Sequence, residues 1–385
     1  MGERAGAAFP DFDFDALRRA PGVEAPNLFA VDASDRLILD EAASCVAAHP
    51  DAVAVFGDRF GALTLGAAAR FGCRDILVFQ DDLVGEQALR RNADRWRMGD
   101  TFRRLEPARD VGDLQNTAGP VTGARTVLMQ APRSLTELDE WCAQIARHAH
   151  PDVQVFIGGR IKHLSLTMNE VISRHFGSLQ VSRARQKSRV LRASAPTRSG
   201  VTAPSRHFHA DHSLWVCAYP GAFAGTSIDI GTRALLEVLD QTPAYDTAID
   251  LGCGTGVLAT ALARHRPVAR IIASDQSWAA VRSAEATLRA NGVTGQVVRD
   301  IGLASQPDAS ADLIVLNPPF HVGATITADL AAPLFRDAAR VLRPGGELWT
   351  VWNSHLHYRA DLERAVGPTR EIARTPKFTV TASRR

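Results

Sequence analysis

The sequence predicts an α/β protein built from two tandem domains, each a doubly wound sheet with helices on both faces. The first observation is the length, because 385 residues suffice for two domains with a core each. The second is an alternation of short apolar runs with helical periodicity, which occurs over 27–192 and again over 228–381. The third is a stretch rich in Pro, Ser, Thr and Gly at 193–206, which is typical of a linker. We therefore expect an N-terminal domain over 1–192 and a C-terminal domain over 207–385.

The elements of the first half follow from this pattern. Residues 1–26 carry Gly, Pro and alternating Asp and Phe, and they predict a loosely held lead-in. Residues 179–193 indicate two strands around a basic turn. The remaining elements are helices at 34–48, 60–70, 84–97 and 135–149 and strands at 51–56, 75–80, 125–130 and 153–157.

The second half repeats the plan. Helices are expected at 228–239, 257–264, 278–291, 330–342 and 358–366. Strands are expected at 247–251, 269–274, 296–299, 313–316 and 347–352, with a closing hairpin from 370–373 and 378–381. This number of strands fits a seven-stranded, mostly parallel sheet.

The composition limits the class of protein. A hydrophobic content of 45% with 22% charged residues is typical of a soluble globular protein, and a net charge of +2 is too small to identify a nucleic-acid binder. The five cysteines are scattered, and no signal pattern or long apolar run is present, so we expect a cytoplasmic monomer without membrane contact. His207, His209 and His212 lack other ligands at metal spacing, so we favour a strand edge over a zinc site and expect no metal.

The stretch from Asp312 to Phe320 carries the strongest chemical signal. Its apolar run stops at Asn317, and two prolines exclude further ladder hydrogen bonding at the point where open α/β sheets bind ligands. A planar heterocycle with an exocyclic amine would fit, donating to the Asn317 oxygen and the Pro318 carbonyl and stacking on Phe320. The alternative is a strand that simply ends at a rigid turn. The expected catalytic residues are Asn317, Pro318, Pro319 and Phe320.

A second signal is Asp-Leu-Gly-Cys-Gly-Thr-Gly at 250–256. The glycines let a strand-to-helix turn pass close under a ligand, but the spacing is not the Gly-x-Gly-x-x-Gly of a dinucleotide site. Asp250 suits a cationic ligand, Asp275 can bind a ribose diol, and Asp300 is placed to reach an adenine amine. S-adenosyl-L-methionine has all of these groups; a glycine-rich turn without a ligand is the alternative. The expected cofactor-binding residues are Asp250, Gly252, Cys253, Gly254, Gly256, Asp275, Gln276, Asp300 and Asn317.

The two halves resemble copies of one domain. Aligning 60–63 with 255–258 puts Val55 opposite Asp250 and Arg59 opposite Gly254, where an arginine would fill the ligand space. The fourth strand of the first half ends in Met-Gln-Ala-Pro-Arg and lacks Asn-Pro-Pro-Phe. We interpret this as a duplicated domain whose first copy has lost its site; two unrelated α/β domains are the alternative.

These motifs resemble those of a known family. The sequences at 250–256 and 317–320 look like those of class I S-adenosylmethionine-dependent methyltransferases acting on amino nitrogens. More narrowly, the chain is similar to ribosomal RNA guanine-N2 methyltransferases, and to the large-subunit (23S) enzymes more than the small-subunit ones, at 221–224, 228–233, 353–358, 377–380, 31–35 and 60–63. The resemblance covers nearly the whole chain. It implies two tandem Rossmann-like methyltransferase domains with a degenerate N-terminal copy that binds RNA or has a structural role.

The resemblance implies methyl transfer to the exocyclic N2 amine of a guanine in ribosomal RNA or a ribosomal subunit precursor. Between Glu170 and Asp211 the chain has no acidic residue, and we expect RNA contacts there and on the 228–233 helix start; a solvated basic face is the alternative. The expected RNA-binding residues are Arg183, Arg185, Lys187, Arg189 and Arg233. Two other functions stay open: methylation of another amino group (adenine N6 or protein glutamine), and a non-catalytic RNA-binding assembly factor.

Overall fold

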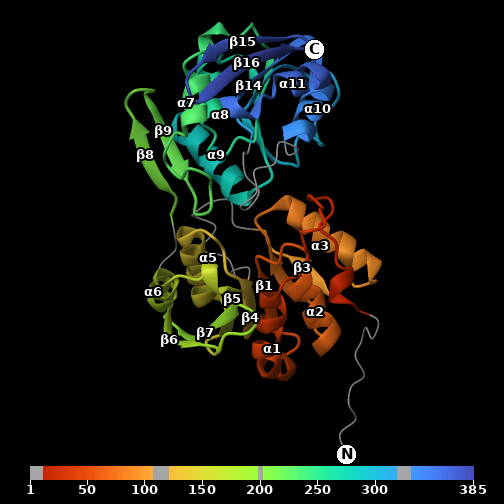
Figure 1. Cartoon of the computed structure of the whole chain (residues 1–385). Coiled ribbons are helices and arrows are strands. Elements are labelled where there is room, and N and C mark those ends of the chain that lie inside the picture. Colours follow the sequence, from red (N-terminus) through yellow and green to blue (C-terminus); the bar gives the residue numbers. More distant parts are fainter. Residues whose placement is uncertain (1–11, 107–120, 198–202, 319–330) are drawn as a thin grey trace, which may run out of the picture. The chain divides into compact units, whose positions relative to one another are not determined.

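The computed structural model describes residues 12–106, 121–197, 203–318 and 331–385. The chain divides into two compact units, Met1–Ala203 and Pro204–Arg385, called unit 1 and unit 2 below (Figure 1). Each unit has its own seven-stranded, mostly parallel sheet, which confirms the predicted fold class. None of the helices within the described ranges is long and apolar enough to cross a membrane.

The sheet of unit 1 has the strand order β3-β2-β1-β4-β5-β7-β6, in which only β7 runs antiparallel to its neighbours. The strands are β1 (Val53–Phe56), β2 (Ile76–Phe79), β3 (Phe102–Arg104), β4 (Thr126–Gln130), β5 (Gln154–Arg160), β6 (Phe176–Val181) and β7 (Ser188–Pro196). The α-helices are α1 (Ala33–Ala48), α2 (Ala62–Phe71), α3 (Leu83–Arg95), α5 (Leu135–His148) and α6 (Leu166–His175).

The core of unit 1 has two layers because successive side chains of a strand point to opposite faces. Val53 and Val55 belong to the cluster formed with α1, α2 and α3. Ala54 and Phe56 belong to the cluster formed with α5 and α6. Among the described residues of unit 1, three helices therefore cover one face of the sheet and two cover the other.

Unit 2 repeats this arrangement, with the strand order β12-β11-β10-β13-β14-β16-β15 and only β16 antiparallel to its neighbours. The strands are β10 (Thr247–Leu251), β11 (Arg270–Asp275), β12 (Gln296–Arg299), β13 (Ala311–Leu316), β14 (Leu342–Asn353), β15 (Thr369–Arg374) and β16 (Phe378–Arg384). Helices α7 (Ile230–Leu236), α8 (Val257–His265) and α9 (Trp278–Ala290) cover one face, and α10 (Ala331–Val341) and α11 (Arg359–Ala365) cover the other.

The register of the central strands matches between the units. Phe56 of β1 pairs with Met129 of β4, and Leu251 of β10 pairs with Leu316 of β13. The glycine that follows each central strand also has the same conformation, with φ of +71° at Gly57 and +70° at Gly252. This agreement in topology and register supports a duplicated domain.

Several expected elements differ from the structure. Strand β3 and helix α6 were not predicted, since three residues give no periodicity and α6 carries polar residues on most of its surface. The lead-in is packed from residue 12 onward: the Phe12 and Phe14 rings contact each other, and Asn92 bonds to the backbone of Arg18. The predicted linker is shorter than 193–206, because its first four residues continue β7 and its last two begin β8.

An additional hairpin opens unit 2. Strands β8 (Ser205–His209) and β9 (Leu214–Ala218) pair antiparallel, so His207 and His209 lie on a strand edge as expected. The hairpin lies along α9 in Figure 1, where the N–H groups of Trp215 and Cys217 donate to Asn291 and Thr287 at 2.9 Å each. Within the described ranges, no group of three His, Cys, Asp or Glu side chains is arranged to hold a metal ion.

Candidate active site

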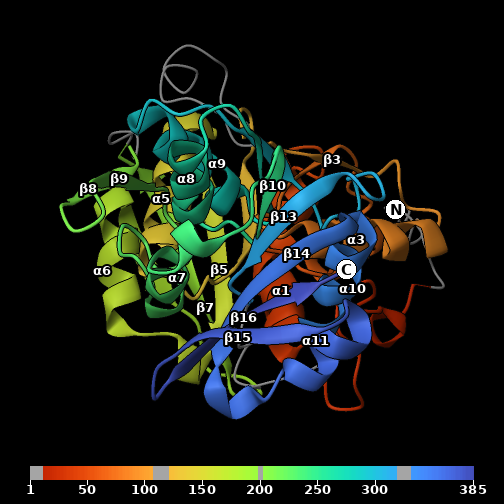
Figure 2. The same ribbon diagram turned by 90° about the horizontal axis from the view of Figure 1, so that it is seen from above.

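The predicted site residues of unit 2 meet at one edge of its sheet. Strand β10 lies between β11 and β13, and β10 and β13 are seen side by side in Figure 2. The glycine-rich turn and Asn317 follow the carboxyl ends of β10 and β13, and Asp275 is the last residue of β11. Asp300 follows β12, and its N–H donates to the Asp275 carbonyl at 2.9 Å. The structure therefore brings these four groups together, as the strand-end pattern predicted.

The glycine-rich turn leaves open space above its backbone. Gly252 and Gly254 have φ of +70° and +51°, and no heavy atom of the described residues lies within 4 Å of a Cβ added at either position. Gly256 has a different role, because a Cβ there would lie 2.8 Å from the backbone of Ala284 in α9. The first two glycines shape a cradle, and the third allows α8 and α9 to approach closely.

Asp250 is buried beneath this turn. Its side chain accepts the N–H of Ala259 in the first turn of α8 at 2.8 Å, and only 1% of the residue is exposed. Burial raises the pKa of Asp250 to about 7; the nearby Asp275 also raises it, and the Ala259 bond opposes the shift. The negative charge of Asp250 is thus unfavourable unless a cation comes near.

Asp275 holds the turn in place. Its two carboxylate oxygens accept the N–H groups of Gly254 and Ser277, each at 3.0 Å. Gln276, the residue after Asp275, is exposed. Cys253 is buried within the turn, and burial raises the pKa of the Cys253 thiol well above its usual value. Asp275 therefore links the cradle to the start of α9.

Asp300 is more enclosed than the sequence suggested. It is 8% exposed, and its oxygens accept the N–H of Ile301 and both the N–H and the hydroxyl of Ser305. These bonds define a local turn after β12. A direct bond from Asp300 to an adenine amine stays a prediction.

Asn317 is held by the start of α7, a contact that the sequence did not predict. Its Nδ2 donates to the Asp229 carboxylate and to the Thr232 hydroxyl, at 3.1 Å each. Its Oδ1 is buried and has no hydrogen-bond partner among the described residues. Asp229 and Thr232 belong to the 228–233 stretch that supported the family resemblance, but nothing in that stretch alone indicates a contact 85 residues away.

The other residues of this strand end are only partly described. Pro318 is buried next to Asn317. Pro319 and Phe320 lie outside the described residues, so the expected stacking face stays a prediction.

The corresponding site of unit 1 is filled by side chains. A Cβ at Gly57 would lie 3.2 Å from the ring of Trp141 in α5, where Gly252 of unit 2 meets open space. Asp58 is buried and accepts the N–H of Thr64, in the first turn of α2, at 2.7 Å. Arg59, at the position that matches Gly254, is exposed, and that it fills the ligand space stays a prediction.

The predicted RNA-binding residues occupy two places. Arg183, Arg185 and Lys187 are exposed in the turn between β6 and β7, with Arg189 half-buried at the start of β7; Arg185 pairs with Asp40 of α1. In unit 2, the Arg233 guanidinium donates to Asp211 at 2.6 Å and to the Ile228 carbonyl at 3.2 Å. Arg233 therefore ties α7 to the β8–β9 loop, and its contact with RNA stays a prediction.

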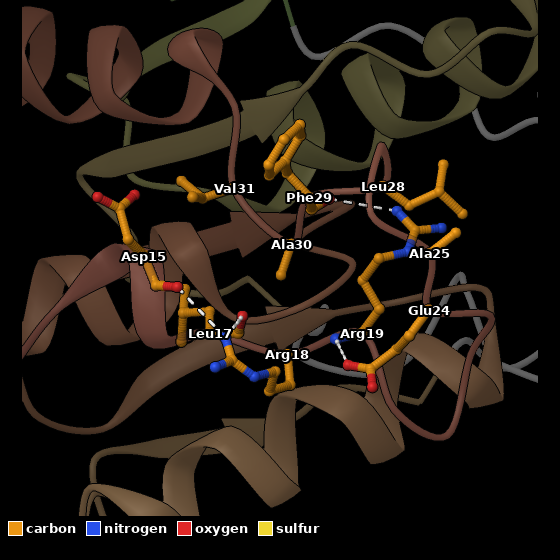
Figure 3. A pocket seen from close by; sticks show the side chains of 10 residues that line it. All are labelled: Asp15, Leu17, Arg18, Arg19, Glu24, Ala25, Leu28, Phe29, Ala30 and Val31. Carbon is orange, nitrogen blue, oxygen red and sulfur yellow. Dashed lines mark hydrogen bonds between the residues drawn. The ribbon is translucent and has the colours of Figure 1, made fainter.

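Unit 1 also has a surface pocket near its N-terminus (Figure 3). Arg18 and Arg19 line it. Arg18 donates to the backbone carbonyls of Asp15 and Leu17, and Arg19 donates to those of Val23 and Phe29. The Arg19 guanidinium also lies 4.6 Å from the centre of the Phe60 ring. The polar groups of this pocket are thus used within the lead-in, and we assign it no ligand.

The chain resembles known proteins in sequence and in fold. Residues 213–382 match the methyltransferase small domain, and residues 9–197 match the RLMG N-terminal domain. A solved T. thermophilus 16S rRNA N2 methyltransferase (RsmC), in complex with AdoMet and guanosine, is similar in fold, with a TM-score of 0.69 and 20% identity over 99% of this chain and 94% of that one.

Two curated relatives establish the family. Ribosomal RNA large subunit methyltransferase G of Streptomyces avermitilis is 33% identical over 95% of both chains. The protein of that name from Magnetococcus marinus is 34% identical over 95% of this chain and 96% of its own. The chain therefore belongs to the ribosomal RNA large subunit methyltransferase G family.

Proposed function

We propose that this protein transfers a methyl group from S-adenosyl-L-methionine to the exocyclic N2 amine of a guanine in large-subunit ribosomal RNA. The observation that carries the proposal is the buried Asn317 Oδ1, which has no partner among the described residues and lies at the strand edge that carries the glycine cradle. A buried acceptor without a partner is unfavourable in the free protein and becomes favourable when a ligand N–H donates to it.

The cradle fits the cofactor. S-adenosyl-L-methionine supplies a methyl group on a positively charged sulfur and leaves as a neutral thioether. Gly252 and Gly254 would let its amino-acid part approach the backbone, and Asp275 would bind the ribose hydroxyls. The raised pKa of Asp250 fits a cationic ligand, whose charge favours the ionised carboxylate. Gln276 and Asp300 complete the proposed set.

Asn317 would orient the acceptor amine. The amino lone pair of guanine is delocalised into the ring, so the free amine is a poor nucleophile. Hydrogen bonds from its N–H groups to Asn317 Oδ1 and the Pro318 carbonyl favour a pyramidal nitrogen whose lone pair points at the methyl. Holding the two groups in line provides up to ~7–11 kcal/mol in well-oriented systems. The methylated nitrogen loses its proton afterwards, so no general base is needed before transfer.

The RNA substrate has to present an unstacked base. Phe320 would stack on it at roughly 1–3 kcal/mol, which offsets part of the unstacking cost. Arg183, Arg185, Lys187 and Arg189 would contact phosphates from unit 1, where the filled turn supports a role other than methyl transfer. We further propose a cytoplasmic monomer, without a metal because a sulfonium needs no Lewis acid to release its methyl group.

The test is methylation of unmodified RNA transcripts by the purified protein. Labelled S-adenosyl-L-methionine is supplied with large-subunit rRNA, small-subunit rRNA or DNA, and the digested product is identified by mass spectrometry. We expect N2-methylguanosine from large-subunit rRNA. N6-methyladenine, or label only on protein, would refute the proposed substrate.

A further inference from the structure

We propose that Gly231 and Asp229 are positioning residues that, with Thr232, fix the Asn317 side chain so that its carbonyl oxygen stays free for the substrate amine. The inference rests on the proposed function and deepens it, because it identifies what prepares the substrate-facing acceptor. The contacts of the Asn317 side chain carry it, and the matching amide of unit 1 provides a comparison.

The orientation of the Asn317 amide follows from its two partners. An ionised carboxylate only accepts hydrogen bonds, so the group that faces Asp229 at 3.1 Å must be the amide nitrogen. The Thr232 hydroxyl accepts from the same nitrogen at 3.1 Å. Asp229 is itself fixed as the N-cap of α7, where it accepts the N–H of Gly231 at 2.9 Å. The nitrogen is thereby tied to α7, and Oδ1 is left without a partner among the described residues.

Unit 1 has an amide at the same place. Because Phe56 pairs with Met129 as Leu251 pairs with Leu316, Gln130, the last residue of β4, corresponds to Asn317, the residue after β13. The helix start beside it also corresponds: Asp32 is the N-cap of α1 and accepts the N–H two residues later, as Asp229 does in α7. Counting from these caps, Ser34 of unit 1 corresponds to Gly231 of unit 2, and Asp35 corresponds to Thr232.

The two amides differ in the group that lies beside them. In unit 1, Gln130 Nε2 donates to Asp35 and, at 3.1 Å, to the Ser34 hydroxyl. The Ser34 hydroxyl donates to the Asp32 carboxylate, and its oxygen lies 3.3 Å from Gln130 Oε1. In unit 2 the position of Ser34 is a glycine, and no hydroxyl is available at that point. The amide of unit 1 therefore has a hydroxyl beside it, whereas the Asn317 oxygen of unit 2 has no such group at the matching position.

The contact with Asn317, and not a backbone conformation that requires glycine, explains why residue 231 is a glycine. Its φ lies outside the left-handed region that favours glycine. A Cβ at 231 would, however, lie 3.0 Å from Asn317 Oδ1 and 3.1 Å from the Asp229 carboxylate, so a side chain there would displace the amide. A serine would also bring a hydroxyl to the oxygen that the substrate amine needs.

The test compares Gly231→Ser and Gly231→Ala with Ser34→Gly, the reverse change at the matching position of unit 1. We expect Gly231→Ser to lower kcat roughly 10²–10³-fold, as does the loss of one preorganised polar contact. The dissociation constant of S-adenosyl-L-methionine stays unchanged. The thermal midpoint of Gly231→Ala does not fall, because alanine favours a helix. Ser34→Gly leaves kcat unchanged.

A second set of variants separates positioning from helix capping. Asn is as good an N-cap as Asp, so Asp229→Asn keeps the helix start but lets the Asn317 amide rotate, and we expect a lower kcat with an unchanged thermal midpoint. Thr232→Val removes the second acceptor, and Thr232→Ser, which restores the hydroxyl, retains more of kcat than the valine variant.

The outcomes distinguish the two proposals. A wild-type protein that methylates guanine N2, combined with an unchanged kcat in Gly231→Ser and Asp229→Asn, would refute the positioning role alone. A wild-type protein that puts no methyl group on guanine would refute the proposed function and this inference with it. A kcat loss confined to the α7 variants, at unchanged cofactor affinity, supports both.

Discussion

At the scale of single residues, the site of unit 2 depends on polar groups that the fold holds in unfavourable states. The Asp250 carboxylate is buried with a raised pKa, and the Asn317 oxygen is buried without a partner among the described residues. Both become favourable when a cation and an N–H donor arrive. This property is expected of a binding site, because a bound ligand supplies the missing charge and the missing donor.

The raised pKa of Asp250 leads to a pH prediction. The pKa of about 7 in the free protein means that the carboxyl is protonated below pH 7. A sulfonium binds better to the ionised form, so the affinity for S-adenosyl-L-methionine should strengthen as pH rises to about 7 and then level off. Calorimetry between pH 5.5 and 8.5 measures this. In Asp250→Asn this dependence of affinity on pH should vanish. Any dependence that comes from titration of the ligand's own amine is the same for both proteins and remains. A wild-type step equal to that of the variant would contradict the assignment.

Residue identities at the site could be predicted from the sequence, and their contacts could not. Asp250, Asp275 and Asn317 were identifiable because a strand end followed by an acid, or by Asn-Pro-Pro, is a local pattern. The bonds of Asn317 to Asp229 and Thr232 join residues 88 and 85 positions apart, which no local pattern reports. Trp141 was missed for the same reason, because the sequence gives no sign that a ring of α5 lies against Gly57.

At the scale of elements, the amino ends of the central strands are fixed by one carboxylate. Asp312, at the start of β13, accepts the N–H groups of Asp246 and Thr247 at 2.9 Å each and an Arg343 N–H at 2.6 Å. Burial alone would raise the pKa of Asp312, but these bonds outweigh it, and the pKa lies below the usual value. Asp312 thus joins β10 to β13 at the edge of the sheet opposite the site.

Removing this carboxylate should destabilise unit 2 in a pH-dependent way. A depressed folded pKa stabilises the fold above the unfolded value of about 3.9, and this contribution is lost as pH falls through the folded pKa. Asp312→Ala should lower the free energy of unfolding by about 1–3 kcal/mol at pH 7, because the bonded N–H groups lose their acceptor. Hydrogen exchange of peptides from β10 checks this.

The control is Asp308→Ala, which removes the exposed pair with Arg340. An exposed pair contributes only ~0–1 kcal/mol, so β10 should exchange as in wild type. Equal effects of the two variants at pH 7, or an Asp312→Ala effect that is as large at pH 2 as at pH 7, would contradict the role of Asp312.

Element boundaries could be predicted where periodicity and caps were strong. Helix α9 begins after the cap Ser277 and ends at Ala290, within a residue of the prediction, whereas β14 begins at Leu342, five residues earlier than expected. Leu342 pairs with Ala311, but the next pair joins Glu347 to Leu313, so residues 343–346 form an irregularity within β14. The regular pairing therefore begins at the predicted residue, and one long-range pair at Leu342 extends the strand.

At the scale of the whole molecule, the chain carries two copies of one topology with different local chemistry. The turn after the central strand is open at Gly252 and closed by Trp141 at Gly57. We therefore expect one S-adenosyl-L-methionine site per chain by calorimetry, abolished by Gly254→Arg, since any side chain at a φ of +51° in that cradle blocks the ligand. A second site, or binding that survives Gly254→Arg, would contradict the assignment.

The basic turn of unit 1 provides a separate prediction. Each phosphate contact removed lowers the slope of log affinity against log salt by roughly 0.7–0.9. Replacing Arg183, Arg185, Lys187 and Arg189 with Ser should weaken RNA binding, flatten its salt dependence and leave cofactor affinity unchanged. A double variant, Arg74→Ser with Arg103→Ser, removes two positive charges elsewhere on unit 1 and serves as the control. An unchanged salt slope would favour the alternative, in which this turn is a solvated basic face that does not contact RNA.

The most direct test of the proposed site is Asn317→Ala, measured for both kcat and cofactor affinity. Asn317 faces the base, whereas Asp250, Asp275 and the glycine turn hold the cofactor. We therefore expect kcat to fall roughly 10²–10³-fold, as when one preorganised polar contact is lost, with the dissociation constant for S-adenosyl-L-methionine nearly unchanged. Loss of cofactor binding with normal turnover at saturation would contradict the assignment of Asn317 to the substrate amine.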